Sequence, residues 1–348
     1  MPTLPPRTDV DQLRRRAKER LAAARTGDPA ARAAFTAAGL PETLASAQLL
    51  LAREHGLPSW PALLLAIAHR RVLDLRDPKA LAAFVREHPE CATAELQPWR
   101  DHPQGASPLG YLAMARYDTT TKRWRDVDGT AAAAHVLLAA GAPVDGPPGA
   151  KETPLITAAS YGDAALAAVL IAAGANVEAK AAEDAGGVPG GTALLHAAVF
   201  GMTDVLDVLV AAGAKARSLE EAAAAGELGE WLRADLDPQT LVRALVMASD
   251  HQRLAAIDRL LAHGVPVDAE DARFHRQPLR LAAANGRVQS VEALLAHGAD
   301  PARADHLGRT PLALCLAARA VAADPAPFDV VAERLRRALE SGQGTPRA

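Results

Sequence analysis

Two short patterns recur in a fixed order along this chain of 348 residues, and this repetition constrains the fold more than any other feature of the sequence. The first pattern is Thr-Pro-Leu followed by small apolar residues. The second, about twenty residues later, is an apolar run that ends in Gly-Ala. Copies of the first lie at 107–113, 153–159, 192–198, 277–283 and 310–314, and copies of the second at 138–142, 171–176, 210–214, 261–265 and 295–300. Such a chain is expected to stack similar units in a row instead of enclosing one globular core.

Each repeated unit predicts a pair of short helices. Thr153 is suited to cap the first helix, and Pro154 fits its first turn, where a missing N–H costs nothing. A glycine such as Gly162 then interrupts the chain before a second helix, whose apolar residues follow helical spacing, as at 205–209. The glycine that closes the unit, Gly174 in one copy, can adopt the left-handed conformation that ends a helix.

These two motifs resemble those of the ankyrin repeat, whose period is about 33 residues. The spacing from Gln277 to Thr310 is 33 residues. The resemblance implies an all-α solenoid of stacked helix-turn-helix units, and we count seven or eight of them between residues 72 and 340. Two of these, 219–232 and 241–268, are weaker copies, and 77–91 is a degenerate helix pair. The composition agrees, because 49% of the residues are hydrophobic but only 3% are aromatic, which favours helices over a β-sandwich.

Residues 1–70 do not repeat, and we predict that they form an N-terminal helical cap. Amphipathic helices are expected at 11–24 and 44–55, and 59–61 opens a third. The segment 45–61 is similar to a helical lead-in that precedes ankyrin repeats in many bacterial proteins, and the high Ala and Arg usage also points to a bacterial source. The repeat array is predicted at 71–341, with a helix at 328–339 covering its open end and a flexible tail at 342–348.

Charge and cysteine content restrict the environment of the protein. Thirty-eight basic and 41 acidic residues give a net charge of −3, which does not favour nucleic-acid binding, and the basic run at 14–20 is interpreted as the solvated side of a helix. Cys91 and Cys315 are too few for a disulfide framework and are expected to be inert core thiols. The apolar stretch 164–175 is about half as long as a membrane span, and 1–10 lacks the apolar region of a secretory signal. We therefore expect a cytoplasmic protein with no membrane partner.

The familiar signatures of catalysis are missing from the sequence. It contains no phosphate-binding Gly-rich loop, dinucleotide fingerprint, HExxH motif or nucleophile elbow. We predict no catalytic residue, no cofactor and no metal ligand, and we favour a binding protein over an enzyme, although a catalytic site can assemble from distant residues. The first helix of each unit is the inner helix and the second the outer helix, and the turn before each inner helix is a finger. His196 matches a histidine in the inner helix of the family. The resemblance implies that this histidine joins neighbouring fingers through hydrogen bonds. His263 and His297 are expected to hydrogen-bond across a helix end.

The resemblance also implies where a partner binds: on the finger tips and the exposed side of the inner helices, which form a concave face. The positions that map there are Glu152, Ser160, Tyr161, Phe200, Asp250, His251, Arg273, Phe274, Arg276, Asn285 and Arg309. Tyr161 and Phe200 occupy the same position in consecutive repeats, where two rings are typical of interface anchors but could equally fill the space between inner helices. The pattern predicts an interaction scaffold that binds a protein partner on its concave face.

A second concentration of aromatic and charged residues lies between 99 and 128. The stretch 116–129 lengthens the turn between an inner and an outer helix, and we expect it to fold onto the concave face and wall off a pocket. The candidate pocket residues are Trp99, His102, Tyr111, Arg116, Tyr117, Asp118 and Trp124. The alternative function is therefore a small-molecule-binding protein or an enzyme. An enclosed cavity that holds a Tyr or His with a carboxylate would favour this alternative.

Overall fold

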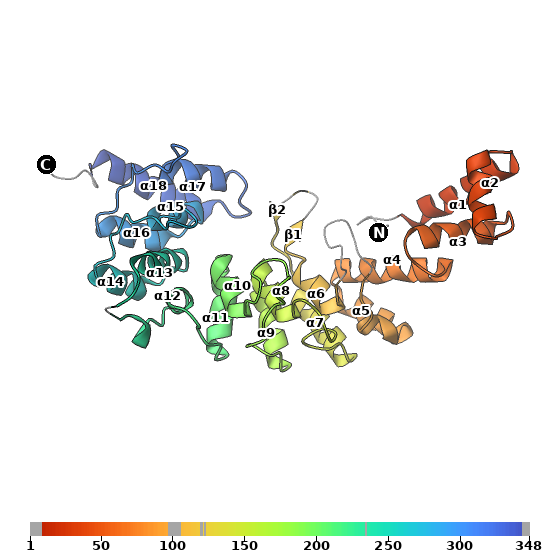
Figure 1. The fold of residues 1–348 in the computed structure, drawn as a ribbon, viewed down its shortest axis with the longest axis horizontal. Coiled ribbons are helices and arrows are strands. Elements are labelled where there is room, and N and C mark those ends of the chain that lie inside the picture. Colours follow the sequence, from red (N-terminus) through yellow and green to blue (C-terminus); the bar gives the residue numbers. More distant parts are fainter. Residues whose placement is uncertain (1–8, 97–105, 119–120, 122, 234, 343–348) are drawn as a thin grey trace. The chain divides into compact units, whose positions relative to one another are not determined.

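The computed structural model describes residues 9–96, 106–118, 121, 123–233 and 235–342. These residues form eighteen α-helices, two short 3₁₀-helices and one two-stranded hairpin (Figure 1). The predicted all-α fold is confirmed for this part of the chain. The residues group into two compact units, one made of 1–115 with 128–148 and the other of 116–127 with 149–348. No helix in the described ranges combines the length and the apolar character needed to cross a bilayer.

The first unit contains seven α-helices and one 3₁₀-helix. They are α1 (Val10–Arg25), α2 (Pro29–Ala37), α3 (Leu44–Glu54), α4 (Trp60–Leu75), α5 (Pro78–Glu87), η1 (Pro89–Ala92), α6 (Pro108–Ala113) and α7 (Thr130–Ala139). Helix α1 packs against α2 and α3, and α3 packs against α4. Helix α4 then lies beside α6, and α5 beside α7, so that α4–α5 and α6–α7 are successive helix pairs. The degenerate pair expected at 77–91 is thus α4 with α5, because 77–91 itself holds only α5 and a 3₁₀ turn.

Apart from the segment 116–127, which belongs to the second unit, the chain passes from the first unit to the second between Pro148 and Gly149. The first helix pairs of the predicted array therefore lie in the same compact unit as α1, α2 and α3 of the predicted cap. The division into a cap at 1–70, an array at 71–341 and a tail at 342–348 stays a prediction.

The second unit contains the remaining helices and the hairpin. They are β1 (Tyr117–Asp118), β2 (Arg123–Trp124), α8 (Pro154–Tyr161), α9 (Ala164–Ala172), α10 (Ala193–Val199), α11 (Thr203–Ala211), α12 (Leu219–Ala225), η2 (Gly229–Trp231), α13 (Pro238–Asp250), α14 (Leu254–Ala262), α15 (Pro278–Ala284), α16 (Val288–Ala296), α17 (Pro311–Arg319) and α18 (Ala326–Glu340). The first helix of each pair packs on the next first helix, in the order α8, α10, α12, α13, α15, α17. The second helices also pack on one another, α9 on α11 and α14 on α16 and then α18.

The local signals that predicted these helix pairs act as expected. The hydroxyl of Thr153 accepts a hydrogen bond from the backbone N–H of Ile156 at 3.2 Å and so caps α8. Gly174 follows α9 with a φ of 90°, a conformation that costs glycine little and other residues much more. The first turn and the end of each helix are therefore fixed by residues close in sequence.

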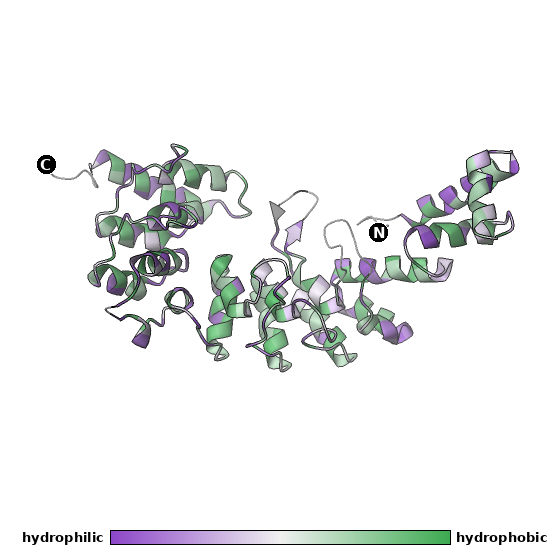
Figure 2. Ribbon diagram, viewed as in Figure 1, coloured by the Kyte–Doolittle hydropathy of each residue, from purple (hydrophilic) through white to green (hydrophobic). Residues whose placement is uncertain are grey.

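Buried Leu and Ala side chains form the interior of the second unit. Helix α9 consists only of Ala, Leu, Val and Ile, and α11 has few polar residues, so both are green along most of their length in Figure 2. In the C-terminal repeats one continuous cluster includes Leu245, Leu279, Leu294 and Leu335, each from a different helix. Each repeat thus buries its apolar face against its neighbours, as stacked repeats require.

The repeat at 219–232 differs from the others because its second helix is only one 3₁₀ turn. Helix α12 is followed by η2, whose Trp231 is exposed. Helix α12 also packs closely on the 13-residue helix α13. The row of first helices therefore continues through this repeat although its second helix is missing.

Candidate functional site

The finger at 271–276 is the turn that precedes α15, and Asp271 fixes its backbone through hydrogen bonds. The carboxylate of this buried residue accepts hydrogen bonds from the backbone N–H groups of Arg273 and Phe274, at 3.0 and 2.9 Å. Its own backbone N–H donates to the carbonyl of Arg276 at 2.9 Å, and its carbonyl accepts from His275 at 2.8 Å. His275 has a φ of 53°, in the left-handed region, which lets the chain turn back towards α15. The conformation of the tip is therefore fixed by its own hydrogen bonds.

This finger presents an aromatic ring between two cations. The side chain of Phe274 is 53% exposed, and the guanidinium carbons of Arg273 and Arg276 lie 4.8 and 5.2 Å from the centre of its ring. Each such cation–π contact stabilises an exposed arrangement by about 0.5–1 kcal/mol. We call these three residues, held by Asp271, the Arg-Phe-Arg finger.

A charged network lies beneath the Arg-Phe-Arg finger. Glu270 accepts hydrogen bonds from the guanidinium of Arg280 and, at 3.0 Å, from Nδ1 of His275. Partial burial raises the pKa of Glu270, but these two hydrogen bonds outweigh it and hold the pKa below its usual range. The ring of His275 also lies 5.5 Å from that of His306 in the next finger. Neighbouring fingers are thus in direct contact.

Ser160 and His196 form a link between two repeats. His196 is buried, and its Nε2 lies 3.0 Å from the carbonyl oxygen of Val188 while its Nδ1 lies 2.8 Å from the Ser160 hydroxyl. Because a carbonyl only accepts, Nε2 carries the proton and Nδ1 accepts from Ser160. Burial lowers the pKa of His196, which keeps the ring neutral at pH 7. His196 therefore has the structural role that the resemblance implied, and Ser160 is only partly exposed.

Asp250 and His251 were expected on the exposed side of an inner helix, but the structure buries both. His251 is 0% exposed and bonds to the hydroxyl of Thr203 at 3.0 Å and to the carbonyl of Ala198 at 2.9 Å. The carboxylate of Asp250 accepts from the side-chain amide of Asn285 at 2.7 Å and from Nε of Arg287 at 3.2 Å. Both side chains hydrogen-bond to residues of other repeats, Ala198 and Thr203 on one side and Asn285 and Arg287 on the other, so they contribute no exposed surface.

Arg287 completes this link and was not singled out from the sequence. Its second guanidinium nitrogen donates to the carbonyl of Gly201 at 2.6 Å, so that α10, α13 and α15 are joined by one chain of hydrogen bonds. In the sequence, the only sign of its role is its position two residues after Asn285, which is a weak signal because the chain has many arginines.

Tyr161 and Phe200 occupy equivalent positions but different surroundings. The ring of Tyr161 is partly buried and lies 6.4 Å from the ring of Tyr117. Burial, with the nearby Glu152 carboxylate and Tyr117, raises the pKa of Tyr161. Phe200 is 41% exposed and meets the ring of His196 edge-on at 6.0 Å. Phe200 is therefore available to a partner, whereas much of Tyr161 is covered.

The insertion at 116–127 folds into a hairpin that contacts α8. Tyr117 pairs with Trp124 and Asp118 with Arg123 in the antiparallel strands β1 and β2. The guanidinium of Arg116 donates to the carbonyl of Gly162, the residue that ends α8. This contact and the Tyr117–Tyr161 ring pair place the hairpin against the C-terminal end of an inner helix.

The predicted pocket residues are distributed over both units. Trp99 and His102 lie outside the described residues, and the side chain of Trp124 is not described either. Arg116, Tyr117 and Asp118 belong to the second unit, whereas Tyr111 belongs to the first and donates a hydrogen bond to Asp74 at 2.8 Å. Burial raises the pKa of Tyr111, and the carboxylate of Asp74 raises it further. A pocket formed by the 99–128 insertion stays a prediction.

The remaining predicted positions differ in exposure. Glu152 is partly buried, and this burial raises the pKa of its carboxyl, although a hydrogen bond from Thr157 acts in the opposite direction. Arg309 and Asn285 are exposed, and Arg309 pairs with Asp305 at 2.8 Å. His297 was expected to bond across its helix end, but the structure pairs it with Asp258 of the preceding outer helix α14, at 2.8 Å.

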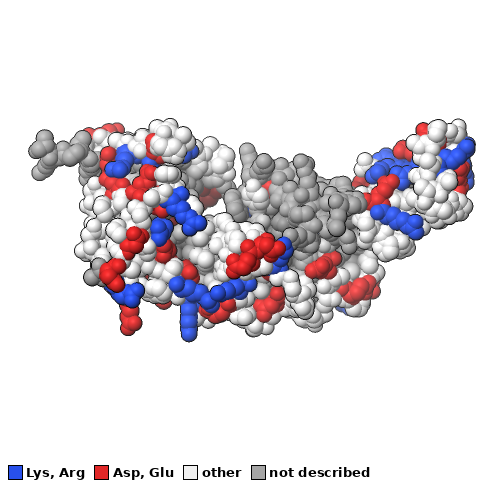
Figure 3. All heavy atoms as spheres, in the orientation of Figure 1, with Lys and Arg blue, Asp and Glu red and all other residues white. Residues whose placement is uncertain are grey.

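The surface carries charges of both signs. On the face drawn in Figure 3, Lys and Arg side chains alternate with Asp and Glu side chains over the described residues. The charges of the whole sequence sum to −3. Within the described ranges, no group of three or more His, Cys, Asp or Glu side chains is placed to hold a metal ion.

The helix pairs and projecting fingers define a helical-repeat protein with the architecture of a binding scaffold. A family model described as ankyrin repeats in three copies matches residues 222–323, and a model of the single ankyrin repeat matches 151–182. Residues 151–182 and 222–323 are therefore similar to ankyrin repeats, and the described residues form an all-α fold.

One solved structure and the curated proteins complete these comparisons. The chain is similar to the crystal structure of the human ASB11 ankyrin repeat domain, with 24% sequence identity and a TM-score of 0.31. That match covers 66% of this chain and 97% of the ASB11 chain. No curated protein matches the chain.

Proposed function

We propose that this protein is an interaction scaffold and that its Arg-Phe-Arg finger anchors a protein partner. The observation that carries the proposal is the exposed ring of Phe274 between the guanidinium groups of Arg273 and Arg276. Aromatic residues and arginine are the side chains most enriched among those that contribute most to binding energy at protein interfaces.

The rigidity of the finger supports the same function. Its backbone is already fixed by Asp271, so a partner that binds there does not have to order the loop. The flanking cations favour a partner segment that offers a carboxylate beside an apolar side chain, because the ring supplies the apolar contact and the guanidinium groups supply charge-assisted hydrogen bonds. Phe200, in an earlier repeat of the same unit, is a second exposed ring.

A reducing, cytoplasmic location fits this proposal. Cys91 and Cys315 are both buried free thiols. Burial raises the pKa of Cys315, and that of Cys91 to about 11, so both stay protonated at neutral pH. The bacterial source inferred from composition stays a prediction.

The test compares partner capture by the full chain and by a variant with Phe274→Ala, Arg273→Ala and Arg276→Ala. We expect partners recovered from a lysate of the source organism to bind the variant about thirtyfold more weakly or worse, because truncating an interface anchor costs about 2 kcal/mol or more. The matched control is Arg334→Ala, which removes a partly exposed arginine of α18 that pairs with Glu292 of α16. Equal dissociation constants for the wild type and the triple variant would show that the finger is not the anchor.

A further inference from the structure

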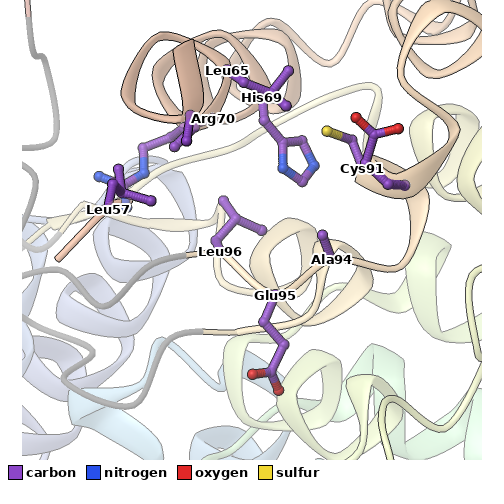
Figure 4. Close-up of a pocket in the computed structure, with 11 residues that line it drawn as sticks. Leu57, Leu65, His69, Arg70, Cys91, Ala94, Glu95 and Leu96 are labelled. Atoms are coloured by element: carbon purple, nitrogen blue, oxygen red, sulfur yellow. The ribbon is translucent and has the colours of Figure 1, made fainter. Parts of the chain in front are cut away.

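A cavity of about 170 Å³, partly open to solvent, lies in the first unit beside α4. Its apolar walls are Leu57, Leu65, Ala66 and Leu96. Figure 4 shows the ring of His69 pointing from α4 into the space above Ala94 and Leu96, while the carboxylate of Glu95 points away from it. The cavity is thus mainly apolar, with one imidazole directed into it.

The imidazole of His69 offers an unused hydrogen-bond acceptor. The residue is 5% exposed, and its Nε2 has no hydrogen-bond partner among the described residues. The other ring nitrogen, Nδ1, forms a hydrogen bond with the backbone of Cys91, and this bond raises the pKa of His69. A bond that raises the pKa of a histidine stabilises its protonated form, so Nδ1–H is the donor and the carbonyl of Cys91 is the acceptor. Burial and the neighbouring Arg70 cation nevertheless lower the pKa of His69 to about 4. At pH 7 the ring is neutral, and Nε2 keeps its lone pair.

The remaining polar groups point to binding instead of covalent chemistry. Burial and the nearby Glu90 carboxylate raise the pKa of the Cys91 thiol to about 11, so it is not a thiolate at neutral pH. A protonated thiol is a weak nucleophile. The group in this cavity that lacks a hydrogen-bond partner among the described residues is therefore Nε2 of His69.

We infer that this cavity binds a small aromatic molecule with a single hydroxyl donor, of which phenol is the simplest. A cavity of about 150 Å³ lined by apolar side chains holds one benzene ring in another protein, so the size fits. The leucine and alanine walls would bury the ring, and the hydroxyl would donate to Nε2 of His69. A buried acceptor that gains a donor favours this ligand over an apolar ring of the same size.

The experiment titrates the full chain with phenol and with fluorobenzene, which has nearly the same size but no donor. We expect saturable binding of phenol and about threefold to tenfold weaker binding of fluorobenzene, the range that one hydrogen bond supplies. Calorimetry gives the two affinities. The ¹⁵N resonance of His69 Nε2, followed in histidine-labelled protein, reports the hydrogen bond directly.

Two variants separate the cavity from the acceptor. His69→Phe keeps a ring beside Phe84, with which His69 stacks at 5.9 Å, and should bind phenol and fluorobenzene equally. Ala66→Phe fills the cavity and should lose both ligands while circular dichroism stays unchanged. The control His135→Phe replaces an exposed histidine of α7 and should keep the preference for phenol.

Three results would overturn the inference. They are equal affinities for phenol and fluorobenzene in the wild type, a preference for phenol that persists in His69→Phe, and no saturable binding of phenol at concentrations that leave the fold intact. The last result, with an Nε2 resonance typical of a hydrogen-bonded ring, would assign the position beside His69 to water. The inference does not depend on the Arg-Phe-Arg finger, and substitutions in the finger should leave phenol binding unchanged.

Discussion

Polar side chains form hydrogen bonds between different repeats. Ser160 reaches His196, and Thr203 reaches His251, in each case with an imidazole as the acceptor. Both histidines are buried, and burial lowers the pKa of each, so both rings stay neutral and can accept. The same chemistry in the first unit leaves His69 with an acceptor that has no partner among the described residues. At this scale a structural histidine differs from a candidate binding group in whether another repeat supplies the hydrogen-bond donor to its ring.

The buried state of His69 predicts a pH-dependent stability. Its pKa is about 4 in the folded chain and about 6.5 when unfolded, so the unfolded chain binds more protons between these values. Stability from this group is complete well above pH 6.5 and falls as the pH drops towards 4, by about 1.5 kcal/mol between pH 6.5 and 5. Urea unfolding followed by Trp60 fluorescence, with the other three tryptophans changed to Phe, measures it.

The matched variant for this prediction is His69→Phe, which cannot titrate. The difference in unfolding free energy between the wild type and this variant should change with pH in the direction given. A difference that stays constant from pH 6.5 to 5 would mean that His69 is charged in the folded protein.

Helices show which parts of the structure are accessible to sequence reasoning. The caps and breaks at Thr153, Gly162 and Gly174 act through residues within four positions, so the pattern predicted these helix pairs correctly. Helix α2 at Pro29–Ala37 was not predicted, because it lies in the part of the chain that does not repeat, although Asp28 caps it and Pro29 stands in its first turn.

The candidate sites depend still more on contacts between distant residues. Asp250 and His251 occupy positions of the repeat that are expected at the surface, but both are buried. Asp250 pairs with Arg287, 37 residues away, and His251 bonds to Thr203, 48 residues away. The cavity beside His69 brings α4 together with residues 90–96 and has no local signature. The Arg-Phe-Arg finger was found from the sequence because its position in the repeat alone places it at a tip.

The Asp250 link predicts how strongly the repeats around α13 depend on it. Asp250→Ala leaves the partly buried guanidinium of Arg287 and the amide of Asn285 without their acceptor, which should destabilise α10, α13 and α15 by about 3 kcal/mol. Native-state hydrogen exchange of the amides in these helices measures the loss. The control Asp204→Ala, at an exposed position of α11, should cost less than about 1 kcal/mol. Equal protection in the two variants would show that the buried pair contributes nothing to stability.

At the scale of the whole molecule, two compact units each have their own interior. The first is built around clusters that include Leu63 and Leu51, and the second around the cluster that includes Leu245 and Leu294. Units with separate cores need not unfold in one step. The binding finger and the cavity lie in different units, so each proposed site can be altered without removing the core that supports the other.

This separation predicts that urea unfolds the protein in more than one transition. We expect far-ultraviolet circular dichroism to show two phases, and Asp250→Ala to shift only the phase of the second unit to lower urea. Trp60 lies in the first unit, so the midpoint of its fluorescence transition should stay where it is in the wild type. Stacked repeats gain stability mainly from adjacent repeats, so a local loss is not expected to reach the other core. A single transition, in which Trp60 fluorescence and circular dichroism move together by the same amount in Asp250→Ala, would mean that the two units fold as one cooperative body.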